Sequence, residues 1–357
     1  MPNKYDKINI LILLIIAVSV VSAAAQNEIV ELEFLMPSLN GYDSSRPQYD
    51  ILKVREAGGP CQNGLYLLTC TGDLNNLFEK ENRAMIETPL LNRSWRYCSI
   101  FSAAGNDTAW MGRNWDNENV GSIIVSFYKP YKGYASVFFS RSIDLGFPLH
   151  VDLDEIVGSE LGSNLLLAPF YTYDGMNEHG LAVGIAGCAP QTVKSIEGKP
   201  KIMIPYLVRK ILDGARTIDE ALVLVEDYIP FDLDENSLNS HLFVMDSSGR
   251  SLILEYIANQ WRKTSADGPW QVMSTKPVYN VPDSVLRKNC WRYLGMSESL
   301  EQADGNINFK TALEILQNVS QIGTVWSAVY SPTTKDLYFS VYQHWDKIYH
   351  LPFPLKQ

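Results

Sequence analysis

From residue 98 onward, short apolar runs of strand length recur along the chain. Four of them are rich in β-branched and aromatic residues: 98–102, 122–128, 135–140 and 181–185. Runs of this length, bounded by polar and glycine-containing segments, predict β-strands. Their close spacing predicts an antiparallel sheet.

Helical patterns interrupt these strands. Residues 203–212 and 309–319 are apolar at helical spacing, and Thr217 to Glu220 form a capping box before the apolar run 221–225. Two hairpins are predicted, one around the turn 246–249 and one joining 325–330 to 337–342. Strands before, between and after grouped helices predict an α+β fold in which helices cover the outer faces of sheets.

The first residues predict export. A lysine-bearing start is followed by the mainly apolar run 8–21 and by Ala23, Ala24 and Ala25. This is typical of a secretory signal peptide over residues 1–25, and the run is shorter than the ~20 residues of a membrane span. A retained anchor is the alternative. We expect a protein that is secreted or lies in another extracytoplasmic compartment, such as a periplasm or a lysosome-like organelle, without a stable membrane anchor.

Composition narrows the classes of partner. The formal net charge is −10 with no cluster of basic residues, so a nucleic-acid partner is not expected. Five widely spaced histidines and the absence of P-loop, dinucleotide, zinc-protease and nucleophile-elbow motifs predict neither a metal nor a cofactor. Five cysteines leave one unpaired in an exported protein, and Cys61 could pair with Cys70.

The candidate catalytic residues lie in and after the strand predicted to begin at Cys98. Cys98 opens this strand, and Arg113 and Asp116 lie near the end of the next one. Across a hairpin these residues would place a thiol, a cation and a carboxylate together. The cation would stabilise a thiolate, and the carboxylate would hold a protonated group. On spacing alone, a buried structural cysteine beside a surface Arg–Asp pair is the favoured explanation of the pattern.

Several segments together resemble a known family. Cys-Ser-Ile-Phe from Cys98, followed by Gly-Arg-Asn-Trp-Asp ending at Asp116, is similar to the mature start of the linear amide C-N hydrolases. These include choloylglycine hydrolase, penicillin V acylase and the acid-amidase group. The resemblance continues through segments 173–181, 241–255, 272–277, 291–293 and 324–342. It therefore spans about residues 98–342 and implies an αββα sandwich of the N-terminal-nucleophile class.

The resemblance also implies a mechanism. Cleavage between Tyr97 and Cys98 would free the amine of Cys98, and this amine would act as the base for its own thiol. Residues 26–97 would be a pro-region or leading subunit, and residues 98–357 the catalytic domain. Further roles follow from the matched positions: Asp116 would hold the amine, Arg113 would act on the thiol or acyl group, Arg292 would close the charge network, and Tyr173 or Asn177 would donate to an oxyanion.

Thr275 departs from the family's pattern. The family has an asparagine here as a second oxyanion donor, whereas a threonine hydroxyl has a shorter reach. Either Thr275 together with a backbone amide compensates for the missing asparagine, or the enzyme differs from its family in substrate or speed.

The expected function is hydrolysis of amide bonds in small N-acyl compounds of bile-salt, penicillin V or N-acyl-amine type, through a thioester on Cys98. Three alternatives remain open: an acyltransferase that uses the same residues, an inactive ligand-binding homologue, and a papain-like protease. The oligomeric state, including a homo-oligomer, is also open.

Overall fold

We describe the protein from a computed structural model that covers residues 27–33, 46–54, 64–87, 98–105, 107–117, 121–232 and 235–353. The predicted signal peptide, Cys61 and Tyr97 lie outside these residues. None of the described helices is both long and apolar enough to cross a membrane.

Two large sheets form the body of the molecule. In the nine-stranded sheet the order is β14 (Gln260–Ser265), β13 (Ser251–Ile257), β12 (Ser237–Met245), β9 (Ala182–Thr192), β8 (Asp174–Asn177), β7 (Ser136–Arg141), β6 (Ile123–Pro130), β3 (Leu65–Gly72) and β2 (Gln48–Val54). The seven-stranded sheet has the order β1 (Glu28–Glu31), β18 (Lys347–Pro352), β17 (Asp336–Val341), β16 (Thr324–Tyr330), β5 (Trp110–Asp116), β4 (Ser99–Ala103) and β15 (Trp270–Met273). A small parallel pair, β10 (Lys201–Met203) and β11 (Ile229–Phe231), lies apart.

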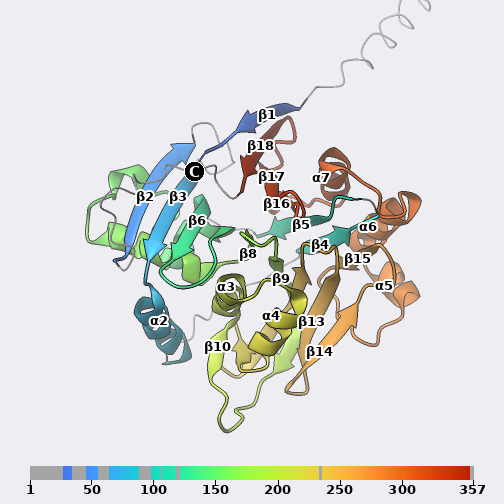
Figure 1. Cartoon of the computed structure of the whole chain (residues 1–357), viewed down its shortest axis with the longest axis horizontal. Helices are drawn as coiled ribbons and strands as arrows, with labels where there is room; N and C mark the ends of the chain where they lie inside the picture. The colour runs from blue at the N-terminus through green and yellow to red at the C-terminus, as the bar shows by residue number, and fades with distance from the viewer. Residues whose placement is uncertain are drawn as a thin grey trace, which may run out of the picture.

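Helices cover both sheets on their outer sides. The helices α5 (Asp283–Asn289), α6 (Trp291–Gln302) and α7 (Phe309–Asn318) lie together in Figure 1, where α6 packs on β4 and β15, and α7 packs on β5 and β16. On the other sheet, α3 (Ile204–Gly214) packs on β8 and β9 and is paired with α4 (Ile218–Val225). The predicted α+β fold, an αββα sandwich, is confirmed.

Local sequence signals explain where several elements begin. The Thr217 side chain accepts a hydrogen bond from Glu220 N (3.3 Å) at the start of α4, and Asn308 caps α7 in the same way. Between β12 and β13, Gly249 has φ +85° in the turn that follows Asp246. Both predicted hairpins are present, and Thr217 is the predicted N-cap, while the Glu220 carboxylate accepts from Arg216 N, one residue before the cap.

The inner faces of the sheets meet in an aromatic layer. Trp115 of β5 stacks on Trp326 of β16 with ring centroids 4.2 Å apart, and Phe139 of β7 stacks on the same indole at 5.2 Å. Since Trp115 and Trp326 come from one sheet and Phe139 from the other, these rings join the two sheets. The layer fixes the strands that carry the candidate site.

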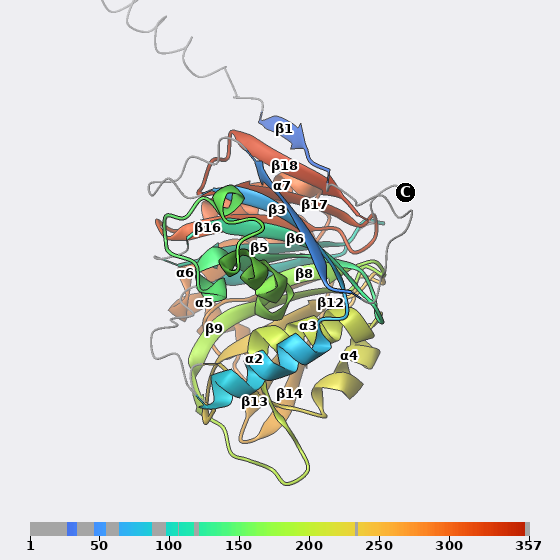
Figure 2. The ribbon, with the colours of Figure 1, turned by 90° about the vertical axis from the view of Figure 1, so that its left-hand side faces the viewer.

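The segment before Cys98 is built into the same sandwich. All eight residues of β3 are buried, and the strand pairs with β6 on one side and β2 on the other. After it, α2 (Asn75–Glu87) buries Phe78 against the rings of Tyr128, Phe170 and Tyr206. Figure 2 shows α2 beside α3, and β1 next to β18 from the other end of the chain. The described parts of residues 26–97 therefore contribute strands to both sheets.

Candidate active site

The hairpin of β4 and β5 brings Cys98 and Arg113 together. Its register pairs Ile100 with Arg113, so the side chain of Cys98, two residues earlier, lies diagonally opposite Arg113 on the same face. Arg113 Nη2 donates to Cys98 Sγ at 3.5 Å, and both side chains are buried. A guanidinium in this position stabilises negative charge on the sulfur.

Arg113 is held by the opposite sheet. Its Nη1 forms an ion pair with Asp174 of β8, and its Nη2 donates to Ile185 O of β9 at 2.7 Å. Burial lowers the pKa of Arg113, but the neighbouring Cys98, Tyr330 and Asp116 favour the charged form. The side chain is therefore a fixed cation that faces the thiol.

Asp174 is a site residue that the sequence reasoning did not single out. Its carboxylate accepts hydrogen bonds from Tyr330 Oη (2.8 Å) and Trp326 Nε1 (3.2 Å) in addition to Arg113, and it is fully buried. The position falls inside segment 173–181, whose resemblance to the family was one available signal. Its role becomes evident only when the two sheets are packed face to face.

Gly184 leaves space for the Arg113–Asp174 ion pair that joins the two sheets. A Cβ atom on Gly184 would come within 2.9 Å of Ile100 Cδ1 and 3.6 Å of Arg113 Cδ. A side chain at this position would press on the side chain of Ile100, two residues after the thiol, and would touch the aliphatic stem of Arg113.

Asp116 lies at the end of β5, beyond the paired positions Ser99 and Asn114. Its Oδ1 accepts from Thr324 Oγ1 (2.6 Å), and its Oδ2 accepts from Gln321 Nε2 (2.7 Å) and Arg292 Nη1 (3.3 Å). Burial raises the pKa of Asp116 to about 6, although these donors oppose the shift. The carboxyl is thus poised to titrate in the weakly acidic range.

Arg292 connects Asp116 to Thr275. Besides its contact with Asp116, Arg292 Nη2 donates to Thr275 Oγ1 at 3.4 Å. Arg287, five residues earlier in the chain, pairs instead with Asp283 and Glu301 on the surface. The structure thus brings Arg113, Asp116, Arg292 and Thr275 into one connected region beside Cys98.

Tyr173 and Asn177 make other contacts. The hydroxyl of Tyr173 donates to Asp144 Oδ2 (2.6 Å) and accepts from Arg141 Nη2 (2.8 Å). The amide of Asn177 donates to Leu212 O and Ala215 O, while its oxygen accepts from the backbone of residues 179 and 181. Because these hydrogens are already donated, the structure does not support the expectation that either residue serves an oxyanion.

Two solved structures share the fold of this chain. The chain matches the penicillin V acylase from Agrobacterium tumefaciens with a TM-score of 0.52 at 18% identity, covering 72% of this chain and 86% of that one. It matches a mutant of the conjugated bile acid hydrolase from Clostridium perfringens with a TM-score of 0.53 at 12% identity, covering 73% and 94%. The fold is that of the N-terminal-nucleophile hydrolases.

Sequence comparison then defines the family. A family model described as acyl-coenzyme A:6-aminopenicillanic acid acyl-transferase matches residues 168–356, which is more than half of the chain. The protein belongs to this family, and the predicted relationship to the linear amide C-N hydrolases is confirmed.

Two relatives match shorter segments. The penicillin V acylase of Pectobacterium atrosepticum is 31% identical over 137 residues, which are 35% of this chain and 35% of that protein. An uncharacterised protein of Paramecium bursaria Chlorella virus 1 is 32% identical over 117 residues, 30% of this chain and 40% of the viral protein. The chain thus spans well under half of the length of these relatives.

Proposed function

We propose that the protein is a self-processing hydrolase of non-peptide C–N amide bonds, with Cys98 as its nucleophile. The observation that carries this proposal is the hydrogen bond from Arg113 Nη2 to Cys98 Sγ, made by a guanidinium that Asp174 and Ile185 O hold in place. A fixed cation 3.5 Å from the sulfur favours the negative charge that the sulfur carries when it attacks a carbonyl carbon.

The first reaction activates the enzyme. The thiol of Cys98 attacks the carbonyl carbon of Tyr97, the peptide C–N bond breaks, and the Cys98 nitrogen takes the proton and becomes a free amine. Water then hydrolyses the resulting thioester and releases the carboxylate of Tyr97. This single cut creates the base of later turnovers, and hydrolysis of the thioester regenerates the thiol nucleophile.

Turnover uses the new amine as the base. An α-amine with a pKa of about 7.7–8.0 accepts the thiol proton near neutral pH. The thiolate attacks the substrate carbonyl, the proton passes to the departing nitrogen, and an acyl thioester remains on Cys98 until water removes it. Asp116 would orient the protonated amine, with Arg292, Gln321 and Thr324 keeping the carboxylate in position.

Thr275 is the oxyanion donor in this proposal. Arg292 Nη2 occupies an acceptor site of the Thr275 hydroxyl, so the hydroxyl proton is free to point toward a developing negative charge. Small amides with an acyl half of bile-salt, penicillin V or fatty type are the proposed substrates, because the structural relatives include a penicillin V acylase and a bile acid hydrolase.

Residues 27–87 stay with the catalytic chain in this proposal. Removing β3 would expose one edge of β6, and removing α2 would break the hydrogen bonds of Asn82 with Lys201 O (3.0 Å) and Met203 N (2.9 Å). Because both losses expose buried groups, we expect the cleaved protein to remain a complex of two chains. Co-elution of both fragments in gel filtration after cleavage supports this, and a catalytic fragment that elutes alone contradicts it.

We also propose that the enzyme acts outside the cytoplasm, as the signal-like segment 1–25 predicts. Expression with and without these residues, followed by fractionation, tests this. Export that does not depend on residues 1–25 would refute it.

The experiment for the proposed activity is an amide panel. Purified protein and a Cys98→Ala variant are incubated with penicillin V, a bile-acid conjugate and an N-acyl amine, and the released amine is measured. Release by the wild type alone supports the hydrolase. If the cleaved wild type releases nothing yet binds one of these ligands, the inactive binding homologue is the better description.

An acyltransferase is the second candidate, favoured by the family model that matches residues 168–356. Here an amine or thiol, rather than water, would take the acyl group from Cys98. Adding a competing amine during turnover separates the two reactions. A transferase gives mainly the transferred amide, whereas a hydrolase gives mainly the free acid.

A further inference from the structure

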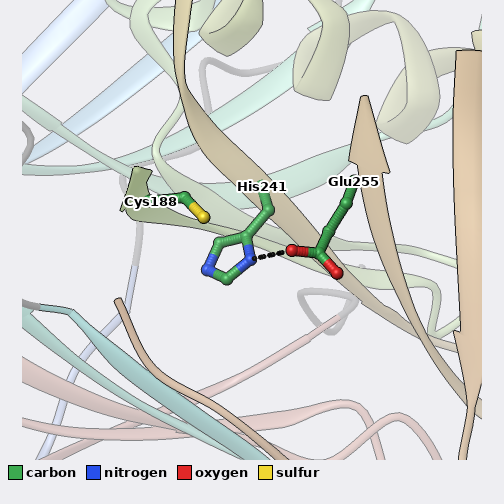
Figure 3. Close-up of side chains that lie close together, drawn as sticks. All are labelled: Cys188, His241 and Glu255. Atoms are coloured by element: carbon green, nitrogen blue, oxygen red, sulfur yellow. Dashed lines mark ion pairs between the residues drawn. The ribbon is translucent and has the colours of Figure 1, made fainter. Parts of the chain in front are cut away.

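A second cysteine site lies in the nine-stranded sheet, on three neighbouring strands. The register of β12 and β13 pairs Leu242 with Leu254, so His241 and Glu255 follow each other across the end of this ladder, and Cys188 of β9 lies two residues beyond Ala186, the partner of His241. The three side chains therefore share one face of the sheet. Figure 3 shows the Cys188 sulfur and the Glu255 carboxylate on either side of the His241 ring. One ligand atom from each residue lies within 4.8 Å of the others.

The backbone orients the imidazole of His241. Its Nε2 lies 2.7 Å from Ser274 O, and since a carbonyl oxygen only accepts, Nε2 carries a proton. Among the described residues Nδ1 has no hydrogen-bond partner, and it lies 3.5 Å from Glu255 Oε1. A histidine that donates one N–H to a backbone carbonyl and turns its other nitrogen toward a carboxylate has the arrangement of a metal ligand.

The backbone also orients Glu255. Tyr279 N donates to its Oε2 at 2.6 Å, and Val278 N lies 3.1 Å from both carboxylate oxygens. Glu255 and His241 are buried, whereas Cys188 is only half-buried. The site is thus supported from the interior and open on the side of the sulfur, which provides an entry path for an ion.

We propose that Cys188 Sγ, His241 Nδ1 and a Glu255 oxygen bind one divalent cation of the Zn²⁺ type. Thiolate and imidazole ligands favour zinc over Mg²⁺ and Ca²⁺, which prefer oxygen. Three protein ligands leave a fourth tetrahedral position for water. Histidine spacing did not predict this site because its ligands come from positions 188, 241 and 255, which only strand pairing brings together.

Binding exchanges protons for the metal. Burial lowers the pKa of His241, but the adjacent Cys188 and Glu255 outweigh this effect and raise the pKa to about 10. Ligation needs a deprotonated sulfur and an imidazole nitrogen with a free lone pair, so any protons bound to these atoms pass to water when Zn²⁺ binds.

The site adjoins the proposed catalytic region. Ser274, whose carbonyl accepts from His241, directly precedes Thr275, and Thr275 Oγ1 accepts from Arg292. Zinc bound to Cys188 would hold the His241 ring in place. Because this ring is hydrogen-bonded to Ser274 O, zinc would also restrict the position of Thr275.

Metal binding by the full-length chain tests the proposal. After dialysis against a chelator, Zn²⁺ binding is measured by equilibrium dialysis, and Co²⁺ is used to look for the ultraviolet absorption of a thiolate–cobalt bond. The variants are Cys188→Ser and His241→Gln. The matched controls are Cys290→Ser, which changes another free cysteine, and Cys98→Ala, which removes the proposed nucleophile.

We expect one equivalent of Zn²⁺ and the cobalt–thiolate band in wild type and both controls, with affinity at least about tenfold weaker in Cys188→Ser. The proposal is overturned if wild type binds no stoichiometric metal, or if Cys188→Ser binds it as wild type does. Rapid alkylation of Cys188 without metal binding would identify a reactive thiol instead, and this also overturns it. If His241→Gln does not fold, the cobalt spectra of wild type and Cys188→Ser alone show whether Cys188 is a metal ligand. Because Cys98→Ala is a control, the result is independent of the proposed amidase activity.

Discussion

Cys98 and Cys188 each lie beside a cationic side chain that pairs with a buried carboxylate, but the two cations differ. Arg113, next to Cys98, cannot release its proton, and its partner Asp174 comes from the opposite sheet. His241, next to Cys188, pairs with Glu255 on the adjacent strand and can exchange its proton for a metal. A cation that keeps its proton can stabilise a nucleophilic thiolate, whereas a side chain that can release its proton can bind a metal.

The largest expected effect comes from removing each carboxylate. Asp174→Asn leaves the Arg113 guanidinium buried without its counterion, which costs about 3–5 kcal/mol of unfolding free energy and prevents cleavage at Cys98. Glu255→Gln costs about 1–3 kcal/mol, because the ring of His241 can become neutral. Urea unfolding of both variants measures the difference. Equal losses would show that the two cations behave alike.

The next effect concerns the proposed oxyanion donor. Thr275→Val should lower kcat of the cleaved enzyme by about 10²–10³ because the hydroxyl proton is lost at nearly constant volume. Ser274→Ala is the matched control, since the Ser274 hydroxyl is buried without a hydrogen-bond partner among the described residues. A Thr275→Val enzyme as fast as the control would remove Thr275 from the mechanism.

The smallest effect is a pH dependence of the Cys98 site. The pKa of Asp116 is raised to about 6, so its carboxylate is lost as the pH falls through that value, and activity should then fall about tenfold per pH unit. In the cleaved enzyme, the ammonium of Cys98 would favour the ionised form of Asp116. It would therefore move the acidic limb of the pH–activity profile to lower pH. Because its pKa is raised from 3.8 to about 6, Asp116 also lowers stability as the pH rises from about 4 to about 6, opposite to an aspartate whose pKa is lowered in the folded state. An Asp116→Asn enzyme that keeps the same acidic limb would assign it to another group.

Local patterns predicted the parts of the molecule that depend on neighbouring residues. The hairpin of Cys98 and Arg113, the capped helix after Thr217 and the hairpin at Gly249 all rely on a few adjacent positions. Contacts between distant segments could not be read this way. Examples are the pairing of β1 with β18, the Arg113–Asp174 bridge and the Cys188 cluster, which depend on how strands far apart in the sequence pack.

Tyr173 and Asn177 illustrate the same limit. Matched positions indicated polar side chains near the nucleophile, and both residues are buried. Which hydrogens remain available depends on Asp144, Leu212 and Ala215, which come from other elements. Residue type alone could not show that these hydrogens are already used.

The most direct test of the account compares wild type with Cys98→Ala and Cys188→Ala by intact mass and N-terminal sequencing. We predict that wild type and Cys188→Ala contain a chain that begins Cys98-Ser99-Ile100, and that Cys98→Ala remains uncut. If wild type keeps the Tyr97–Cys98 bond, or if Cys98→Ala is cut at the same place, Cys98 is not the self-processing nucleophile.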